Sequence, residues 1–173
     1  MMRTKILALS ALLATLPGCD SERFGEVSID ALLNGRGWTA SPSARLNRPG
    51  QLVIVGTTGP VNAPCPYTDP CETLVLASAS AFDGPGTYSA SGDGVMLFSH
   101  KDGDSVLSVY NVLDEQPTFD VESYDPGTGE VRGRFEVTFV LEASLFPPGT
   151  FSPPDTVRFE VGRFIVPLDD LMQ

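Results

Sequence analysis

Glu130-Val131-Arg132-Gly133-Arg134-Phe135-Glu136-Val137-Thr138-Phe139-Val140-Leu141 is the stretch that decides the fold, because it alternates between two kinds of side chain. The odd positions from Val131 to Leu141 are apolar or glycine, and charged or hydroxyl side chains stand between them up to Thr138. Successive side chains of a strand point to opposite faces, so a period of two predicts one face on a core and one on solvent.

The rest of the chain continues this pattern, with runs of β-forming residues separated by turn residues. Asn34-Gly35, Asp102-Gly103 and the segment 125–129 are hairpin signals. Near the end, Val157, Phe159 and Val161 should share a face, and a change of phase at Gly162 predicts a β-bulge. The predicted strands cover 25–33, a strand beginning at 38–40, 51–57, 72–79, 87–89, 95–101, 105–113, 118–124, 130–141 and 155–166.

Roughly ten strands with close turns predict an all-β fold, either an antiparallel β-sandwich or a partly open barrel. We expect a helical turn only at 167–172, and a long surface connection at the proline-rich segment 146–155. The chain has 173 residues, with 22 acidic against 11 basic side chains and a net charge of −11. Without a basic run, the sequence lacks the electrostatic footprint of a nucleic-acid-binding protein.

The N-terminus predicts an address in the bacterial envelope. Arg3 and Lys5 precede an apolar run, 6–16, that is too short for a membrane-spanning helix and typical of a secretory signal. The run ends in Leu16-Pro17-Gly18-Cys19, which resembles a lipobox. We therefore predict a signal peptide at 1–18, a lipidated Cys19 with a short tether at 19–24, and one β domain at 25–173. Acyl chains on Cys19 would anchor the protein to a membrane, at the periplasmic face or the cell surface. A signal that is not lipidated and an uncleaved membrane helix are the alternatives.

Two further cysteines, Cys65 and Cys71, are predicted to form a disulfide. They bracket Pro-Tyr-Thr-Asp-Pro, and closely spaced cysteines of a secreted chain usually pair. A metal site would need two more ligands, and a redox pair would more typically have Cys-x-x-Cys spacing.

Several short motifs resemble those of a family of small bacterial lipoproteins with a β-rich domain of unknown function. Besides the lipobox, they are Asn34-Gly35 with Trp38, the triplet Gly86-Thr87-Tyr88, and two closing strands that carry Gly133-Arg134-Phe135 and Gly162-Arg163-Phe164. The resemblance spans residues 26–166 and implies no catalytic residue.

The sequence contains no recognisable set of catalytic residues. His100, the only histidine, is predicted to lie on the surface beside a hairpin, and no Gly-x-Ser-x-Gly pattern accompanies it. Asp102 and Asp104, with Asp83 and Asp93, could offer oxygen ligands to calcium but lack EF-hand spacing. No metal site and no cofactor is therefore predicted.

Exposed aromatic side chains are the remaining binding candidates. Tyr67, at the tip of the cysteine loop, is the predicted ligand contact, and Tyr124 is expected to be solvated, whereas Trp38 is expected in the core. The sequence thus favours a non-catalytic binding module of the envelope, with a protein or glycan partner. A structural subunit that docks through a sheet edge and a glycan-acting hydrolase are the alternatives.

Overall fold

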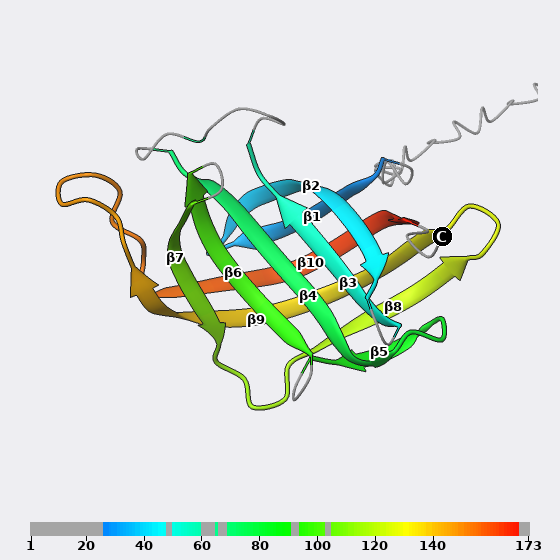
Figure 1. Ribbon diagram of the computed structural model, residues 1–173. Helices are drawn as coiled ribbons and strands as arrows, with labels where there is room; N and C mark the ends of the chain where they lie inside the picture. The colour runs from blue at the N-terminus through cyan, green and yellow to red at the C-terminus, as the bar shows by residue number, and fades with distance from the viewer. Residues whose placement is uncertain are drawn as a thin grey trace, which may run out of the picture.

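The computed structural model describes residues 26–47, 50–59, 65, 69–90, 94–102 and 105–169, and these residues form ten strands and no helix (Figure 1). In that part of the chain, nothing forms a helix long and apolar enough to span a lipid bilayer. The strands are β1 (Ser28–Leu33), β2 (Arg36–Leu46), β3 (Gln51–Thr57), β4 (Cys71–Ala81), β5 (Gly86–Ser89), β6 (Val95–Asp102), β7 (Ser105–Val112), β8 (Thr118–Asp125), β9 (Glu130–Ser144) and β10 (Thr156–Asp169).

All ten strands belong to one sheet, which confirms the predicted antiparallel all-β fold. The strand order is β1-β10-β2-β3-β4-β6-β7-β9-β8-β5, and β1 also pairs with β2 while β10 pairs with β9. These additional pairings close the sheet into a ring of eight strands, and β8 and β5 extend from β9. The one parallel contact, Leu168 and Asp169 of β10 beside Ala44 and Arg45 of β2, lies where the ring closes.

The two longest strands, β9 and β10, form the ladder that organises the sheet. It runs from Thr156 opposite Val140 to Pro167 opposite Glu130. The helical turn expected from residue 167 is wrong, because β10 continues as a strand to Asp169. The backbone N–H of Leu168 donates to the carbonyl of Gly129 at 2.8 Å, which gives this end of β10 a partner.

The predicted bulge lies in this ladder. The register shifts between Phe159 and Gly162, so Phe159 and Phe164 both point into the core. Val161 was expected to share the face of Phe159, and this is wrong. The extra residues of the bulge turn its side chain outward, where it is 66 % exposed.

Reciprocal glycine–phenylalanine pairs join the two strands at the bulge. Gly133 of β9 stands opposite Phe164 of β10, and Gly162 of β10 stands opposite Phe135 of β9. A Cβ at residue 162 would lie 2.6 Å from the Phe135 ring, and one at residue 133 would collide with the Phe164 ring and the backbone oxygen of Asp120. The two Gly-x-Phe motifs of the sequence therefore pack against each other. The glycine of each motif leaves space for the phenylalanine of the other strand.

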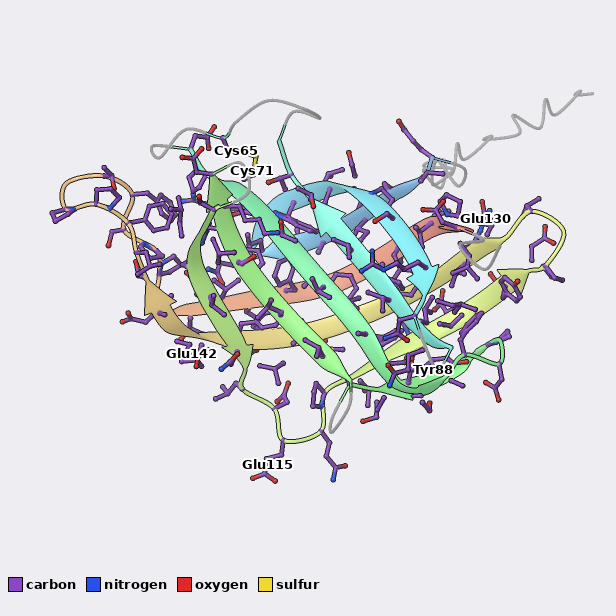
Figure 2. All side chains as sticks on the ribbon, in the orientation of Figure 1. Cys65, Cys71, Tyr88, Glu115, Glu130 and Glu142 are labelled. Atoms are coloured by element: carbon purple, nitrogen blue, oxygen red, sulfur yellow. A yellow bond between two sulfur atoms is a disulfide. The ribbon has the colours of Figure 1, made fainter. Side chains whose placement is uncertain are left out.

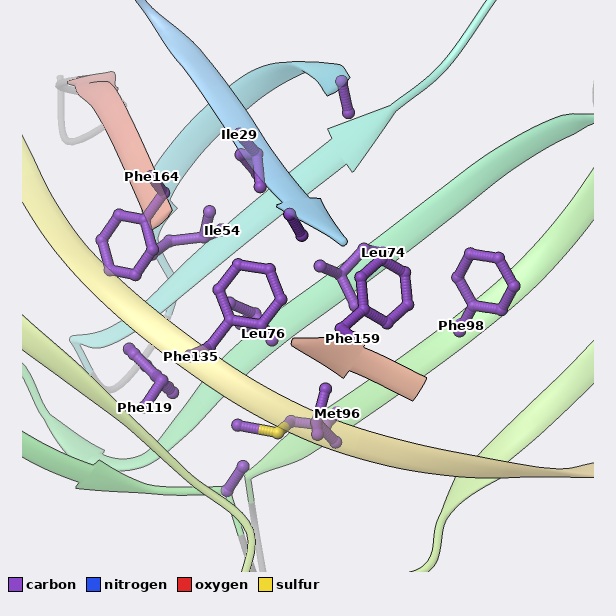
Figure 3. Close-up of a cluster of buried hydrophobic side chains, with 14 of the residues drawn as sticks. Ile29, Ile54, Leu74, Leu76, Met96, Phe98, Phe119, Phe135, Phe159 and Phe164 are labelled. Carbon is purple, nitrogen blue, oxygen red and sulfur yellow. The ribbon is translucent and has the colours of Figure 1, made fainter. Parts of the chain in front are cut away.

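The ring is filled with apolar side chains, and Figure 3 shows aromatic and aliphatic groups from most of its strands meeting at the centre. Phe159 contacts Trp38 edge to face at 5.0 Å between ring centroids, and Phe98 at 5.3 Å. Trp38 is buried, as predicted.

A smaller aromatic cluster fills the space beneath β5 and β8. The hydroxyl of Tyr88 donates to the carbonyl of Gly84 at 2.6 Å, and its ring stacks on Phe119. Tyr124 was expected to be solvated, and this is wrong, because its half-buried ring packs edge to face against Phe82 at 5.2 Å. The register shift in the β8–β9 ladder between Val121 and Ser123 moves Tyr124 out of phase with Asp120, its predicted neighbour on the solvent face.

The first hairpin turn has the predicted geometry. Asn34 and Gly35 have φ angles of 49° and 76°, the left-handed conformation that a type I′ turn requires at both central positions.

Gly133→Ala should lower the free energy of unfolding by roughly 1–3 kcal/mol, because the added methyl group has no room in the β8–β9–β10 contact. Gly37→Ala is the matched control, since a Cβ at residue 37 meets nothing within 4 Å. Urea denaturation of both variants measures the difference, and equal stabilities would contradict the reciprocal packing.

Candidate functional site

The closed sheet has two ends, which differ in the turns and connections that lie there. One end, which we call the proximal end, holds the start of β1, the end of β10 and the turn between β8 and β9 (Figure 1). The disulfide and the β9–β10 connection lie at the other, distal end, and Figure 2 shows Cys65 and Cys71 far from Glu130. Several polar groups, buried or half-buried, lie in contact at the distal end, which makes it the first place to look for chemistry.

We call these groups the Glu72 cluster: Trp38, Glu72, His100, Ser108 and Tyr110. The indole N–H of Trp38 donates to Glu72 Oε2 at 2.6 Å. Glu72 Oε1 lies 3.7 Å from His100 Nε2, and His100 Nδ1 shares a hydrogen bond of 2.7 Å with the Ser108 hydroxyl. Strands β2, β4, β6 and β7 each contribute to this chain of polar contacts.

His100 was predicted to lie on the surface, and this is wrong, because only 2 % of it is exposed. Its ring packs against Phe98 and Tyr110. The sequence contained the signal, since His100 follows Met96 and Phe98 at a period of two and therefore shares their inward face. Glu72 precedes Leu74 and Leu76 at the same period, so the alternation also places it on the inward face.

The connection between β9 and β10, residues 145–155, covers the cluster. Most of its residues are exposed, as predicted for a surface connection, while Phe146 and Phe151 contact the His100 ring, at 5.9 and 5.0 Å between centroids. The Tyr110 hydroxyl donates to the carbonyl of Pro154 at 3.0 Å. These contacts hold the β9–β10 connection against the closed sheet, so the connection covers the distal end of the sheet.

The electrostatics of the cluster act on Tyr110. Burial, followed by the negative charges of Glu72 and Asp155, raises the pKa of its phenol to about 12. The raised pKa keeps the phenol neutral well above physiological pH, and the phenol acts as a hydrogen-bond donor.

A carboxylate, an imidazole and a serine in sequence resemble the components of a hydrolytic triad, but the imidazole and the serine are buried. Catalysis needs an accessible nucleophile and a position about 3 Å from it for the reacting atom. Ser108 is 2 % exposed, and the covered histidine separates it from the connection. The geometry instead supports a structural role, in which the cluster holds β2, β4, β6 and β7 together.

The predicted disulfide is present. Cys65 and Cys71 are joined, with their Cα atoms 5.4 Å apart. Cys71 begins β4 directly before Glu72, and the amide of Glu72 donates to the Thr58 hydroxyl at 2.8 Å. The disulfide therefore ties Cys65 to the strand end that carries the Glu72 carboxylate.

Outside the ring, two sides differ in charge. Outward positions of β3, β4 and β6 form uncharged rows across the strands, with Val55, Val75 and Leu97 in one of them. The outer side of β8, β9 and β10 is rich in ion pairs instead. Its charged residues include Asp120, Glu122, Glu130, Arg132, Arg134, Glu136, Arg158, Glu160 and Arg163.

Two hollows open on the exterior. One of about 460 Å³ lies over β8, β9 and β10 on the charged side, beside the bulge. Another of about 550 Å³ lies over β1, β2 and the end of β3, where hydroxyls such as those of Ser28 and Thr39 line it. Sequence reasoning identified neither, because each combines residues from strands far apart along the chain.

Other predicted site residues lie outside the described part of the chain: Cys19, Tyr67, Asp93 and Asp104. Among the residues that are described, no group of three or more histidine, cysteine, aspartate or glutamate side chains is arranged to hold a metal ion. Comparison with known proteins found no matching protein family, curated protein or solved structure.

Replacing Tyr110 by phenylalanine should change how stability depends on alkaline pH. Because the folded-state pKa is raised from 10 to about 12, the neutral phenol contributes stability that is complete below pH 10 and is lost as the pH rises through 12. Two pKa units correspond to about 3 kcal/mol. Urea denaturation at neutral pH and at about pH 12 should show a smaller loss in Tyr110→Phe than in the wild type. The same loss in both proteins would contradict this environment for Tyr110.

Reduction of the disulfide should lower the free energy of unfolding by about 2 kcal/mol, since the bond closes a short loop in the unfolded chain. Thermal denaturation with and without reductant measures this change. The double variant Cys65→Ser, Cys71→Ser is the control, and it should not respond to reductant. A wild type equally indifferent to reductant would argue against the bond.

Proposed function

We propose that the protein is a lipid-anchored, non-catalytic binding protein of the bacterial envelope, and that it binds through the outside of its ring. The packed interior is the observation that carries this proposal. Trp38, Phe98, Phe135, Phe139 and Phe159 are all at most 5 % exposed. Their side chains fill the space in which a ring-shaped sheet could otherwise hold a ligand, so binding falls to the exterior.

The lipid anchor rests on the sequence Leu16-Pro17-Gly18-Cys19. Seven residues lead from Cys19 to Glu26, where the described chain begins, and an extended chain of that length reaches at most about 25 Å. A lipidated Cys19 would hold the domain close to the membrane by its proximal end. The sides of the ring would then face neighbouring molecules of the envelope.

A second candidate function is that of a structural subunit in an envelope complex. The uncharged rows on β3, β4 and β6 favour it, because a chain with a net charge of −11 leaves three successive rows of this side, through Val95, Leu97 and Ser99 of β6, without a charge. A stoichiometric protein that co-purifies with the full chain, and is lost when Leu97 is replaced by lysine, would favour this role over ligand binding.

Cys19→Ala should move the protein from the membrane fraction to the soluble fraction, because the residue that carries the acyl chains is gone. Fractionation of cells that express the full chain measures this, and mass spectrometry of the mature N-terminus identifies the acyl chains. Cys65→Ser is the matched control, since it removes a cysteine outside the lipobox and should leave the protein in the membrane fraction.

Equal membrane association of Cys19→Ala and wild type would contradict the anchor. Hydrolysis of an envelope polymer by the full chain, abolished by Glu72→Gln, would contradict the non-catalytic role. Protease treatment of intact cells then separates the two locations, because a domain on the cell surface is digested and a periplasmic domain is protected.

A further inference from the structure

The groove of about 460 Å³ on the charged side is built from three adjacent strands. Strand β8 contributes Thr118 and Asp120, β9 contributes Arg134 and Glu136, and β10 contributes Val161 and Arg163. The reciprocal Gly-x-Phe pairs join β9 to β10, and β8 pairs with β9 on its other side, so three hydrogen-bonded strands form the floor of the groove.

Two arginines stand side by side at the centre of the groove. Arg134 lies directly opposite Arg163 in the β9–β10 register. Like charges opposite each other on a sheet destabilise it, and here the flanking positions compensate. Asp120 lies opposite Arg134 on β8, and Asp30 lies opposite Arg163 on β1. The result is a row across the sheet with two cations in the middle and one carboxylate on each side.

Hydroxyl groups hold both flanking carboxylates in place. The Thr87 hydroxyl donates to Asp120 at 2.6 Å, and Arg134 Nε donates to the other oxygen at 3.1 Å. These two hydrogen bonds, the one from Thr87 first, lower the pKa of the Asp120 carboxyl. The hydroxyls of Ser28 and Thr39 donate to the two oxygens of Asp30, at 2.6 and 2.7 Å. The row therefore keeps its charges fixed before any ligand arrives.

The wall of the groove carries backbone strain. Val161 has a φ of 51°, a conformation that β-branched residues rarely adopt. Its side chain is 66 % exposed, so burial of an apolar group does not compensate for the strain. Strained residues and bulges are over-represented at functional sites, where a bulge can re-aim a side chain. Here the bulge presents an isopropyl group to solvent at the mouth of the groove.

We propose that this groove binds the carboxyl terminus of a peptide that ends in a small apolar residue. The carboxylate lies across Arg134 and Arg163, whose planar guanidinium groups suit a two-oxygen anion. The terminal side chain lies against Val161. The Glu136 carboxylate and the Thr118 hydroxyl accept hydrogen bonds from the peptide amides. Capture of a terminal carboxylate in this way is a known mode of peptide recognition.

The charge balance of the groove favours this ligand over a phosphate. Two carboxylates, Asp120 and Glu136, share the groove with the two arginines, and the chain carries a net charge of −11. A phosphate dianion would meet more repulsion than a single carboxylate, and it would leave Val161 without an apolar partner. The inference deepens the proposed function, because it rests on binding at the exterior of the ring.

The test uses the full chain, purified in detergent and labelled with ¹⁵N. Acetyl-alanyl-alanine is the probe, and its C-terminal amide, which lacks the charge, is the matched control ligand. We expect amide shifts at residues 134 and 161–163 with the acid and none with the amide. Arg134→Gln and Arg163→Gln should each weaken binding at least about tenfold, because each removes a charge-assisted hydrogen bond. Arg45→Gln, an exposed arginine on β2 outside the groove, should bind as the wild type does.

Equal binding of acid and amide, tighter binding of glucuronic acid, or equal effects of Arg45→Gln and Arg163→Gln would each overturn the proposal. The comparison of acid with amide uses the wild type alone, so it holds if an arginine variant fails to fold. If no amide shifts appeared at up to about 10 mM probe, the peptide ligand would be refuted, but binding at the exterior of the ring would not. Shifts at Trp38 and His100, without any at the groove, would refute binding at the exterior as well.

Discussion

The close approach of β9 and β10 is the constraint on which the rest of the molecule depends. Gly133 and Gly162 each leave space for a phenylalanine of the other strand, which brings the two longest strands together across the bulge. Strands β8 and β7 pair with successive parts of β9, and β1 pairs with β10. The ring closes because β1 also pairs with β2. A bulkier residue at either glycine would therefore affect both the core and the closure.

Local sequence signals predict much of this fold, and long-range pairings explain what they miss. The alternation around Phe135, the Asn34-Gly35 turn and the Cys65–Cys71 pair depend on neighbours within a few residues, and all three are confirmed. Closure of the ring depends on β1 meeting two strands, one of them more than a hundred residues away in sequence, and no local pattern indicates that choice.

The site residues also divide into those that local patterns indicate and those that depend on long-range pairing. The alternation of their strands indicates the inward positions of His100 and Glu72, although a lone histidine beside a turn is typical of a surface residue. The Arg134–Arg163 row could not be predicted from the sequence, because it depends on the register of β9 against β10. The bulge shifts that register, and the sequence does not indicate by how many residues. Tyr67 and Cys19 lie outside the described residues, so their roles stay predictions.

Apolar side chains pack the interior, and we propose that binding therefore takes place at the exterior of the ring. Trp38, the only tryptophan of the chain, reports on this packing directly, because its indole is buried and donates to Glu72 at the distal end. The measurement is quenching of tryptophan fluorescence by acrylamide in the folded protein. The packed ring predicts blue-shifted emission and weak quenching. Red-shifted emission, quenched as strongly as in the unfolded chain, would mean that solvent enters the ring and that a ligand could bind inside it.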